Sequence, residues 1–219
     1  MISKAESYVA LHDFGGFDPR LYSMEYAPKG NPDIAHTIFN LLRKSDGRTE
    51  LVDHSTLDHG AWIPLRLMYP EANIPVIQIS IQPDRLPEYH YNLGASIVEL
   101  RKHNILIIGS GAMSHNLYEA SFHNHNAAPP EWVQAFTDWM KDRLESGVQK
   151  DVLQYRTVSP YAMKNHPTED HIIPLFIAMG AGNGSKGKRI HTATTYGTIM
   201  MDAYEFTEGK TDQECGPSL

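Results

Sequence analysis

Four of the twelve histidines in this sequence share a setting that suits chemistry. Each follows an apolar segment and stands beside glycine, serine or an acidic residue. A neighbouring carboxylate orients an imidazole, which suits general acid–base work. Imidazole is also a usual ligand of non-haem metals, with a carboxylate holding its second nitrogen. For any single position an ordinary hydrogen-bonded loop histidine is the more common finding. The four are His12, His59, His115 and His171.

The segment before His115 predicts how that side chain is positioned. Residues 105–108 are four apolar residues in a row, which is typical of a strand covered on both faces. Gly109 and Gly111 follow, and they let the backbone turn sharply where the strand ends. Because ligands of open α/β sheets bind at the carboxyl ends of the strands, we expect chemistry at His115.

The glycines of this segment do not form a nucleotide-binding loop. Residues 109–114 lack the third glycine of a dinucleotide fingerprint and the lysine of a phosphate-binding loop. A hydrolase is disfavoured as well, because the sequence has no Gly-x-Ser-x-Gly elbow to supply a nucleophile. His123 and His125 have a chelating spacing, which in a polar loop is more often incidental. His166 opens a loop that either borders a substrate or is a plain turn.

The elements around these histidines predict an α/β fold. Residues 74–81, rich in β-branched side chains, and residues 105–108 are expected to be strands, with a helix over residues 87–104 between them. This order predicts a βαβ unit with parallel strands and a right-handed crossover. We therefore expect a central, mostly parallel sheet flanked by helices. One domain is expected over residues 1–206, followed by a polar tail at residues 207–219.

Capping residues and prolines predict where further helices begin. An Asn-Pro pair at residues 31–32 is a typical helix start. Thr168 is expected to cap another helix, which places His171 in its first turn and Pro174 awkwardly inside it. A helix is also expected through residue 68, with Pro64 in its first turn because proline lacks an N–H.

Composition narrows the classes of function. The chain has 219 residues, a net charge of −7 and scattered basic residues, so nucleic acid and anionic membranes are not expected partners. Its single cysteine, Cys215, excludes a disulfide framework and a cysteine metal site. The sequence has neither a long apolar span nor the pattern of a signal peptide, so a cytoplasmic location is expected.

Several motifs follow one another along nearly the whole chain. They are His12-Asp-Phe-Gly-Gly-Phe, Leu57-Asp-His-Gly-Ala-Trp-Ile-Pro-Leu, Met68-Tyr-Pro-Glu-Ala-Asn-Ile-Pro-Val, Gly109-Ser-Gly-Ala-Met-Ser-His-Asn-Leu, His166-Pro-Thr-Glu-Asp-His and Thr195-Tyr-Gly-Thr-Ile-Met-Met-Asp-Ala-Tyr. Together and in this order they resemble the DOPA-dioxygenase type of class III extradiol ring-opening dioxygenases, which are related to the B subunit of protocatechuate ring-cleaving enzymes.

The resemblance implies a mononuclear non-haem metal, iron(II) or zinc(II), that binds a small catechol and then O2 as co-substrate. It places His171 as a metal ligand and His115 as either a ligand or the base that takes a catechol proton. His59 matches a pocket histidine suited to acid–base work or to contact with a substrate oxygen. His12 and His166 are expected to contact the substrate.

Two family motifs do not occur in this sequence. They are a Ser-His-Gly-Ser-Pro-like turn and a Ser-Ala-His-Trp strand end, each of which supplies a metal-ligand histidine in the family. The expectation is therefore a fold without its N-terminal strands and weak or no metal retention, with an exposed sheet edge that favours association, including a homo-oligomer. Three accounts stay open: a fragment of an active dioxygenase, a short non-catalytic binding or regulatory protein, or strands contributed by another chain.

Overall fold

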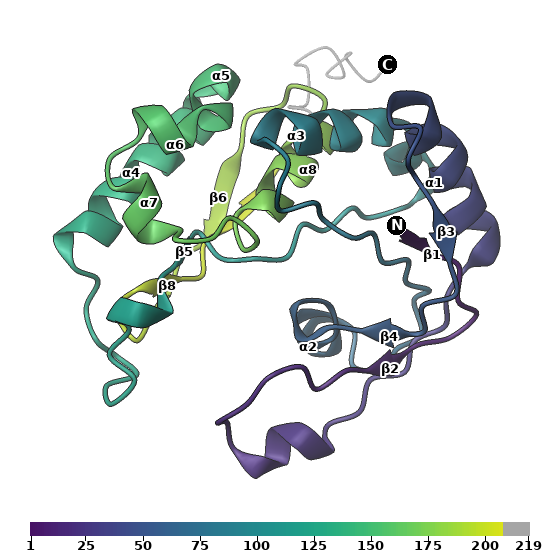
Figure 1. The fold of residues 1–219 in the computed structure, drawn as a ribbon, viewed down its shortest axis with the longest axis horizontal. Coiled ribbons are helices and arrows are strands. Elements are labelled where there is room, and N and C mark those ends of the chain that lie inside the picture. The colour runs from purple at the N-terminus through teal and green to yellow at the C-terminus, as the bar shows by residue number, and fades with distance from the viewer. Residues whose placement is uncertain (208–219) are drawn as a thin grey trace, which may run out of the picture. The chain divides into compact units, whose positions relative to one another are not determined.

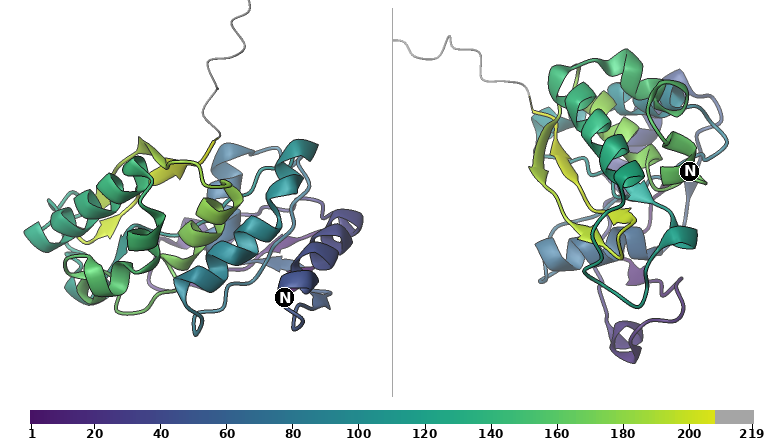
Figure 2. Two further views of the ribbon diagram at one scale, coloured as in Figure 1. Left: turned by 90° about the horizontal axis from the view of Figure 1, so that it is seen from above. Right: turned by 90° about the vertical axis from the view of Figure 1, so that its left-hand side faces the viewer.

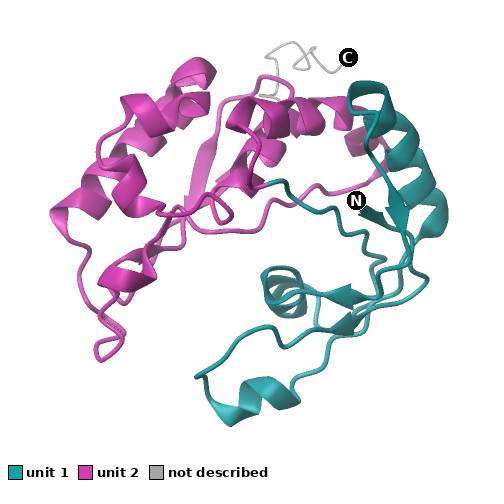
Figure 3. Cartoon of the chain, in the orientation of Figure 1, with its two compact units in different colours: residues 1–82 teal, residues 83–219 magenta. Residues whose placement is uncertain are grey.

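The structure is a computed structural model that describes residues 1–207. The predicted polar tail lies outside the described residues except for residue 207, and so does Cys215. The chain divides into two compact units, residues 1–82 and residues 83–219 (Figure 3). The single domain expected over residues 1–206 stays a prediction.

Unit 1 is built on two short parallel strand pairs (Figure 1). Strand β1 (Ile2–Ser3) pairs with β3 (Leu51–Val52), and β2 (Val9–Ala10) pairs with β4 (Thr56–Leu57). The helices of this unit are η1 (Pro19–Ser23), a 3-10 helix, α1 (Pro32–Ser45) and α2 (His59–Met68). Its core gathers Ala5, Tyr8, Tyr26, Leu57 and Trp62.

The predicted start of α1 is confirmed. The side chain of Asn31 accepts a hydrogen bond from the backbone N–H of Ile34 at 3.1 Å, and Pro32 occupies the first helical position. The strand expected at residues 74–81 is wrong as a named strand. The segment instead forms an isolated antiparallel bridge, Ile79 opposite Ile2, through the bonds from Ser3 N–H to Gln78 O and from Ser80 N–H to Met1 O, both at 3.0 Å.

Unit 2 is mainly helical and carries two antiparallel sheets. The strand order is β5-β8-β7 in one sheet and β6-β9 in the other. Its elements are α3 (Pro87–Ser96), η2 (Val98–His103), β5 (Ser114–His115), η3 (Leu117–Glu119), α4 (Glu131–Ser146), α5 (Gln149–Leu153), α6 (Tyr155–Val158), α7 (Ala162–Asn165), α8 (Ile173–Ala181), β6 (Lys188–His191), β7 (Thr194–Thr195), β8 (Ile199–Met200) and β9 (Ala203–Glu205).

Helices α3 and α8 lie side by side, as both views show (Figures 1 and 2). Two glycines permit the close approach. A Cβ on Gly94 would lie 2.0 Å from the carbonyl oxygen of Ile177, and one on Gly180 would lie 2.0 Å from that of Tyr91. Around this pair the unit buries one hydrophobic core, which includes Phe136, Met140, Tyr155, Phe176 and Met179.

The α/β class is confirmed, but the strand expected at residues 105–108 does not form. Residues 105–109 make no backbone hydrogen bond to any other described residue. The segment still has the alternation of a strand, since Leu106 and Ile108 are exposed at 64% and 46% while Ile105 and Ile107 are half-buried. Without a neighbouring strand, the apolar pattern alone does not produce a ladder.

We predict that the unpaired segment, residues 105–109, promotes association between chains. An exposed, uncharged, apolar segment with unpaired backbone groups is a template for pairing with another chain. Introducing a charge by Leu106→Lys is expected to lower the associated fraction at high protein concentration, measured by light scattering during size-exclusion chromatography. Leu67→Lys is the matched control, because Leu67 is 76% exposed but lies on α2. Equal association of the two variants and the parent would contradict the prediction.

Candidate active site

The predicted site residues fall into two groups. His12 and His59 lie in unit 1, whereas His115, His166 and His171 lie in unit 2. Each group is assembled by different elements and is described by itself.

His115 is held at the end of a short strand. In β5, Ser114 and His115 pair antiparallel with Met200 and Ile199 of β8, and the two strands run together in Figure 1. The hydroxyl of Ser114 donates to the carbonyl of Thr198 at 2.9 Å. Such buried, satisfied contacts fix the backbone from which the His115 side chain projects.

The imidazoles of His115 and His171 stack on one another. Their ring centroids are 3.5 Å apart and their planes differ by 8°. Nδ1 of His171 lies 2.7 Å from Oδ2 of Asp170, a charge contact that lacks the geometry of a hydrogen bond. The structure therefore brings together the two residues that the sequence analysis assigned to the metal, with a carboxylate beside one of them.

Two glycines allow this pair to form. A Cβ on Gly111 would lie 2.0 Å from the carbonyl oxygen of His171, and one on Gly109 would lie 2.1 Å from that of Pro174. The next residue, Ala112, donates its N–H to the same carbonyl of His171 at 2.9 Å. The predicted sharp turn is thus not what these glycines provide. They let two backbone segments touch, which sets the distance between His115 and His171.

The predicted helix start before His171 is wrong. Helix α8 begins at Ile173, and Thr168 to Ile172 form turns ahead of it. The physical reason is Pro174, which lacks an N–H and is accommodated in the first turn of a helix rather than in its interior. His171 therefore lies just before the helix, and its carbonyl is available to Ala112.

Asp170 is ionised at neutral pH. Burial raises the pKa of its carboxyl, but the hydrogen bond with Thr168 and the nearby His171 outweigh burial and hold that pKa below its usual range. A carboxylate beside an imidazole is the arrangement that orients a metal-binding histidine.

His166 is fully buried and supports the loop before β5. Its Nε2 donates to the carbonyl of Met113 at 2.9 Å, and its ring packs against Phe136 and Tyr155. Burial lowers the pKa of His166 to about 4, although the bond to Met113 raises it. These contacts give the ring a structural task, and its role in substrate binding stays a prediction.

In unit 1, His59 is the first residue of α2. Its Nδ1 lies 2.9 Å from Oδ1 of Asp13, and its backbone N–H donates to the same oxygen at 3.1 Å. Asp58 caps the helix by accepting a bond from the N–H of Ala61 at 3.0 Å. Pro64 lies inside α2 rather than in its first turn, because the helix begins at His59.

His12 belongs to an aromatic cluster near His59. Its Nε2 donates to the carbonyl of Met24 at 3.0 Å, and its ring lies 5.5 Å from that of Trp62, with the planes at 62°. Phe14 contacts the rings of both His12 and His59, each at 5.9 Å. The ring of Trp62 is fully buried, whereas that of Phe14 is half-buried and offers an apolar face suited to contact with an aromatic molecule. The assignment of His12 to substrate contact stays a prediction.

Sequence reasoning missed the partner of Asp13. That carboxylate follows His12 in the chain, so a local interpretation assigns it to His12, whereas it binds His59, 46 residues away. No spacing in the sequence reveals this pairing. The signal that pointed to it was only the occurrence of both residues in motifs of one family.

The described residues do not fit a complete metal site. None of them form a group of three or more His, Cys, Asp or Glu side chains that could hold an ion, whereas a facial triad needs three protein ligands. The lone pairs of imidazole nitrogens lie in the ring plane, so two rings stacked at 3.5 Å and 8° cannot both direct a lone pair at one ion.

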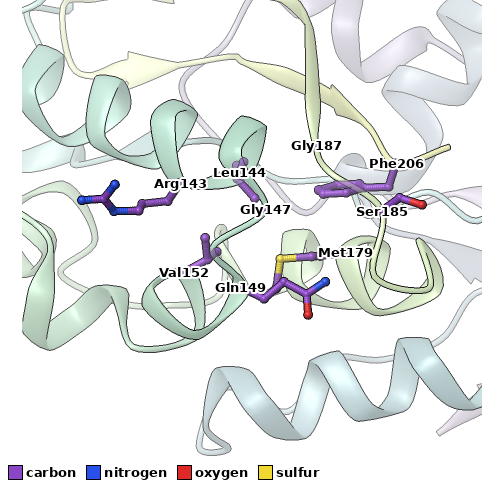
Figure 4. A pocket seen from close by; sticks show the side chains of 9 residues that line it. All are labelled: Arg143, Leu144, Gly147, Gln149, Val152, Met179, Ser185, Gly187 and Phe206. Atoms are coloured by element: carbon purple, nitrogen blue, oxygen red, sulfur yellow. The ribbon is translucent and has the colours of Figure 1, made fainter. Parts of the chain in front are cut away.

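A hollow elsewhere in unit 2 offers no alternative site (Figure 4). It is too narrow to hold a water molecule. None of the predicted site residues lines it. Its lining residues are Arg143, Leu144, Gly147, Gln149, Val152, Met179, Ser185, Gly187 and Phe206.

We predict that a side chain at position 111 destabilises the protein, because Gly111 lies so close to His171. Gly111→Ala is expected to lower the free energy of unfolding by about 1–3 kcal/mol, because the new methyl group collides with the backbone of His171. Urea unfolding measures this change. Gly47→Ala is the matched control, since a Cβ there meets nothing within 4 Å. Equal stability of the two variants would show that the contact is not a constraint.

We predict that the buried His166 makes the free energy of unfolding depend on pH. Its pKa is lowered from 6.5 to about 4 in the folded state, so between these values the unfolded chain binds a proton that the folded chain does not. The free energy of unfolding should therefore fall as the pH drops, by about 2–3 kcal/mol from this residue at pH 4.5.

His166→Gln serves as the comparison for this pH effect, because an amide keeps a donor for Met113 but does not titrate. Urea unfolding of both proteins at pH 7 and pH 4.5 should show a smaller loss in the variant. An identical loss in the two proteins would mean that His166 is not kept neutral by burial.

None of the described helices is both long and apolar enough to cross a membrane.

Comparison with solved structures concerns the fold. The chain is similar to a solved structure of an uncharacterized protein from Escherichia coli K12, with a TM-score of 0.71 and 24% identity over 91% of this chain and 82% of that one. This likeness supports the α/β fold described above.

Sequence comparison identifies the family. The chain is 39% identical over 199 residues to the 4,5-DOPA dioxygenase extradiol of Beta vulgaris, covering 90% of this chain and 74% of the relative. It is 36% identical to the protein of the same description from Mirabilis jalapa, with the same coverage. Residues 1–207 match the family model described as the catalytic LigB subunit of aromatic ring-opening dioxygenase. The chain therefore belongs to the LigB family of extradiol ring-opening dioxygenases, which are non-haem metal enzymes that use O2.

Proposed function

We propose that this protein acts as an extradiol ring-cleavage dioxygenase on a small catechol, with O2 as co-substrate and iron(II) or zinc(II) as the metal. In such a reaction the ring opens beside the diol, both oxygen atoms of O2 enter the product, and a semialdehyde results. The observation that carries the proposal is the match of residues 1–207 to the family, and the proximity of His115 and His171 supports it.

The proposed substrate class rests on two observations. The relatives from Beta vulgaris and Mirabilis jalapa are each described as a 4,5-DOPA dioxygenase extradiol, and DOPA is a catechol. In unit 1, the half-buried ring of Phe14 beside His12 offers an apolar face of the kind that aromatic compounds contact. A small catechol is the class that agrees with both.

The protein's own residues would accept a proton from the catechol and position the substrate. A catechol must lose a proton before its oxygen becomes a strong donor, and a neutral imidazole is a suitable base near pH 7. We assign this task to His115 or His59. His171, with the Asp170 carboxylate at 2.7 Å, is assigned to the metal. His115 is assigned to the metal as well if it is not the base. His12 and His166 are assigned to substrate contact, although the burial of His166 favours support of the loop.

A non-catalytic binding or regulatory protein is the second candidate function. It is favoured by one observation, that the described residues include no group of three metal-binding side chains. Only the first candidate predicts consumption of O2 in the presence of a catechol.

Oxygen uptake separates the two candidates. The purified protein is assayed with added iron(II) and a panel of catechols, and its metal content is measured before and after desalting. We expect O2 consumption that requires both catechol and added iron, together with less than one retained metal ion per chain. His171→Ala is expected to lower the rate by about 10- to 100-fold, as the loss of a metal-site residue does.

His36→Ala is the matched control, because His36 is an exposed residue of α1 that bonds only the carbonyl of Pro32. It should leave the rate unchanged. A folded protein that binds catechol but consumes no O2 would contradict the proposal and favour the binding protein. A tightly held stoichiometric metal would instead show that the ligands have been misjudged.

A further inference from the structure

The side chain of Asp13 contacts His59 through a single oxygen that receives two hydrogen-bonding groups. Oδ1 lies 2.9 Å from Nδ1 of His59 and 3.1 Å from its backbone nitrogen. The backbone N–H can only donate, so Oδ1 is fixed as an acceptor facing the start of α2. The side chain of Asp13 is therefore held in one orientation relative to the His59 ring.

This arrangement fixes where the proton of a neutral His59 resides. Burial raises the pKa of the Asp13 carboxyl, but the bonds from the side chain and backbone of His59 outweigh burial and hold it below its usual range. An ionised carboxylate accepts hydrogen bonds and donates none, so Nδ1 must carry the hydrogen. Nε2 is then the nitrogen with the lone pair, and among the described residues it has no hydrogen-bond partner.

We propose that Asp13 is a positioning residue that holds His59 with Nδ1 protonated, so that Nε2 is the atom that accepts a proton or hydrogen bond from an aromatic hydroxyl group. The second half of this statement rests on the proposed function. The first half concerns only this chain's own residues.

A merely structural role for Asp13 does not account for the contact. Helix α2 is already capped by Asp58, which accepts from the N–H of Ala61 at 3.0 Å. The side chains of His59 and Asp13 are 45% and 33% exposed, and pairs this exposed add little to stability. The ring of Phe14 stands edge-on to that of His59 at 5.9 Å and 89°, which restricts the imidazole further.

The test measures the tautomer of His59 directly. Nitrogen-15 NMR above the titration range distinguishes an imidazole protonated at Nδ1 from one protonated at Nε2, and a His59→Gln variant assigns the signal. We expect the Nδ1–H form to dominate in the parent protein. In Asp13→Ala the Nε2–H form should become the majority, because it is the ordinary preference of a free imidazole.

Asp13→Asn is the conservative variant. Its side-chain oxygen still accepts from the backbone N–H of His59, so Nδ1–H should remain the dominant form. Asp18→Asn is the control, since Asp18 is an exposed carboxylate of the same unit that bonds Arg20 instead. It should leave the His59 signals unchanged. Thermal unfolding of all variants should be similar, which separates positioning from folding.

Catechol turnover provides the second readout. Asp13→Ala is expected to lower kcat/KM by about 10- to 100-fold, with a smaller loss in Asp13→Asn. An unchanged tautomer in Asp13→Ala would overturn the inference, whatever its activity. An absence of turnover in the parent protein would overturn the proposed function, while the tautomer measurement would still decide whether Asp13 positions His59.

Discussion

The candidate centre of unit 2 depends on one close approach between two backbone segments. Gly111 lies so near the carbonyl of His171 that any side chain at this position would overlap it, and Ala112 donates its N–H to the same oxygen. Because His115 lies four residues beyond Gly111, this contact sets where the strand β5 begins relative to the turn that carries His171. The stacked imidazoles follow from the backbone contact, since ring stacking alone contributes too little to order two loops.

In unit 1, the histidine is positioned by hydrogen bonds to a side chain rather than by glycine contacts. His59 is positioned because the N-terminus of α2 presents an N–H that is not used within the helix, and Asp13 accepts both that N–H and the ring. A carboxylate at a helix N-terminus is also favoured by the helix dipole. The cap from Asp58 leaves this N–H for Asp13.

The sequence was most informative where local chemistry decides structure. The Asn-Pro start of α1 is a local capping rule, and the structure confirms it at Asn31. The same kind of rule failed at Thr168, because Pro174 constrained the helix start more strongly than an available cap.

Gly109 and Gly111 were recognised as important from the sequence, but their role was not. They make close contact with residues 171–174, a segment some sixty residues away in the chain. The pairing of Asp13 with His59 is long-range in the same way. Apolar composition at residues 105–108 predicted a strand, yet a ladder needs a partner that composition does not provide.

The unpaired segment before the centre explains why the glycine contacts matter so much. Residues 105–109 are extended without any backbone bond to the other described residues, so a sheet does not fix the register of the chain that leads to His115. The register must then come from the next residues. Gly109 touches Pro174, Gly111 touches His171, and Met113 donates its N–H to Met200 at 2.8 Å. These contacts, together with the bond from Ala112 to the carbonyl of His171 and the short β5–β8 pairing, align His115, and the geometry of the histidine pair depends on them.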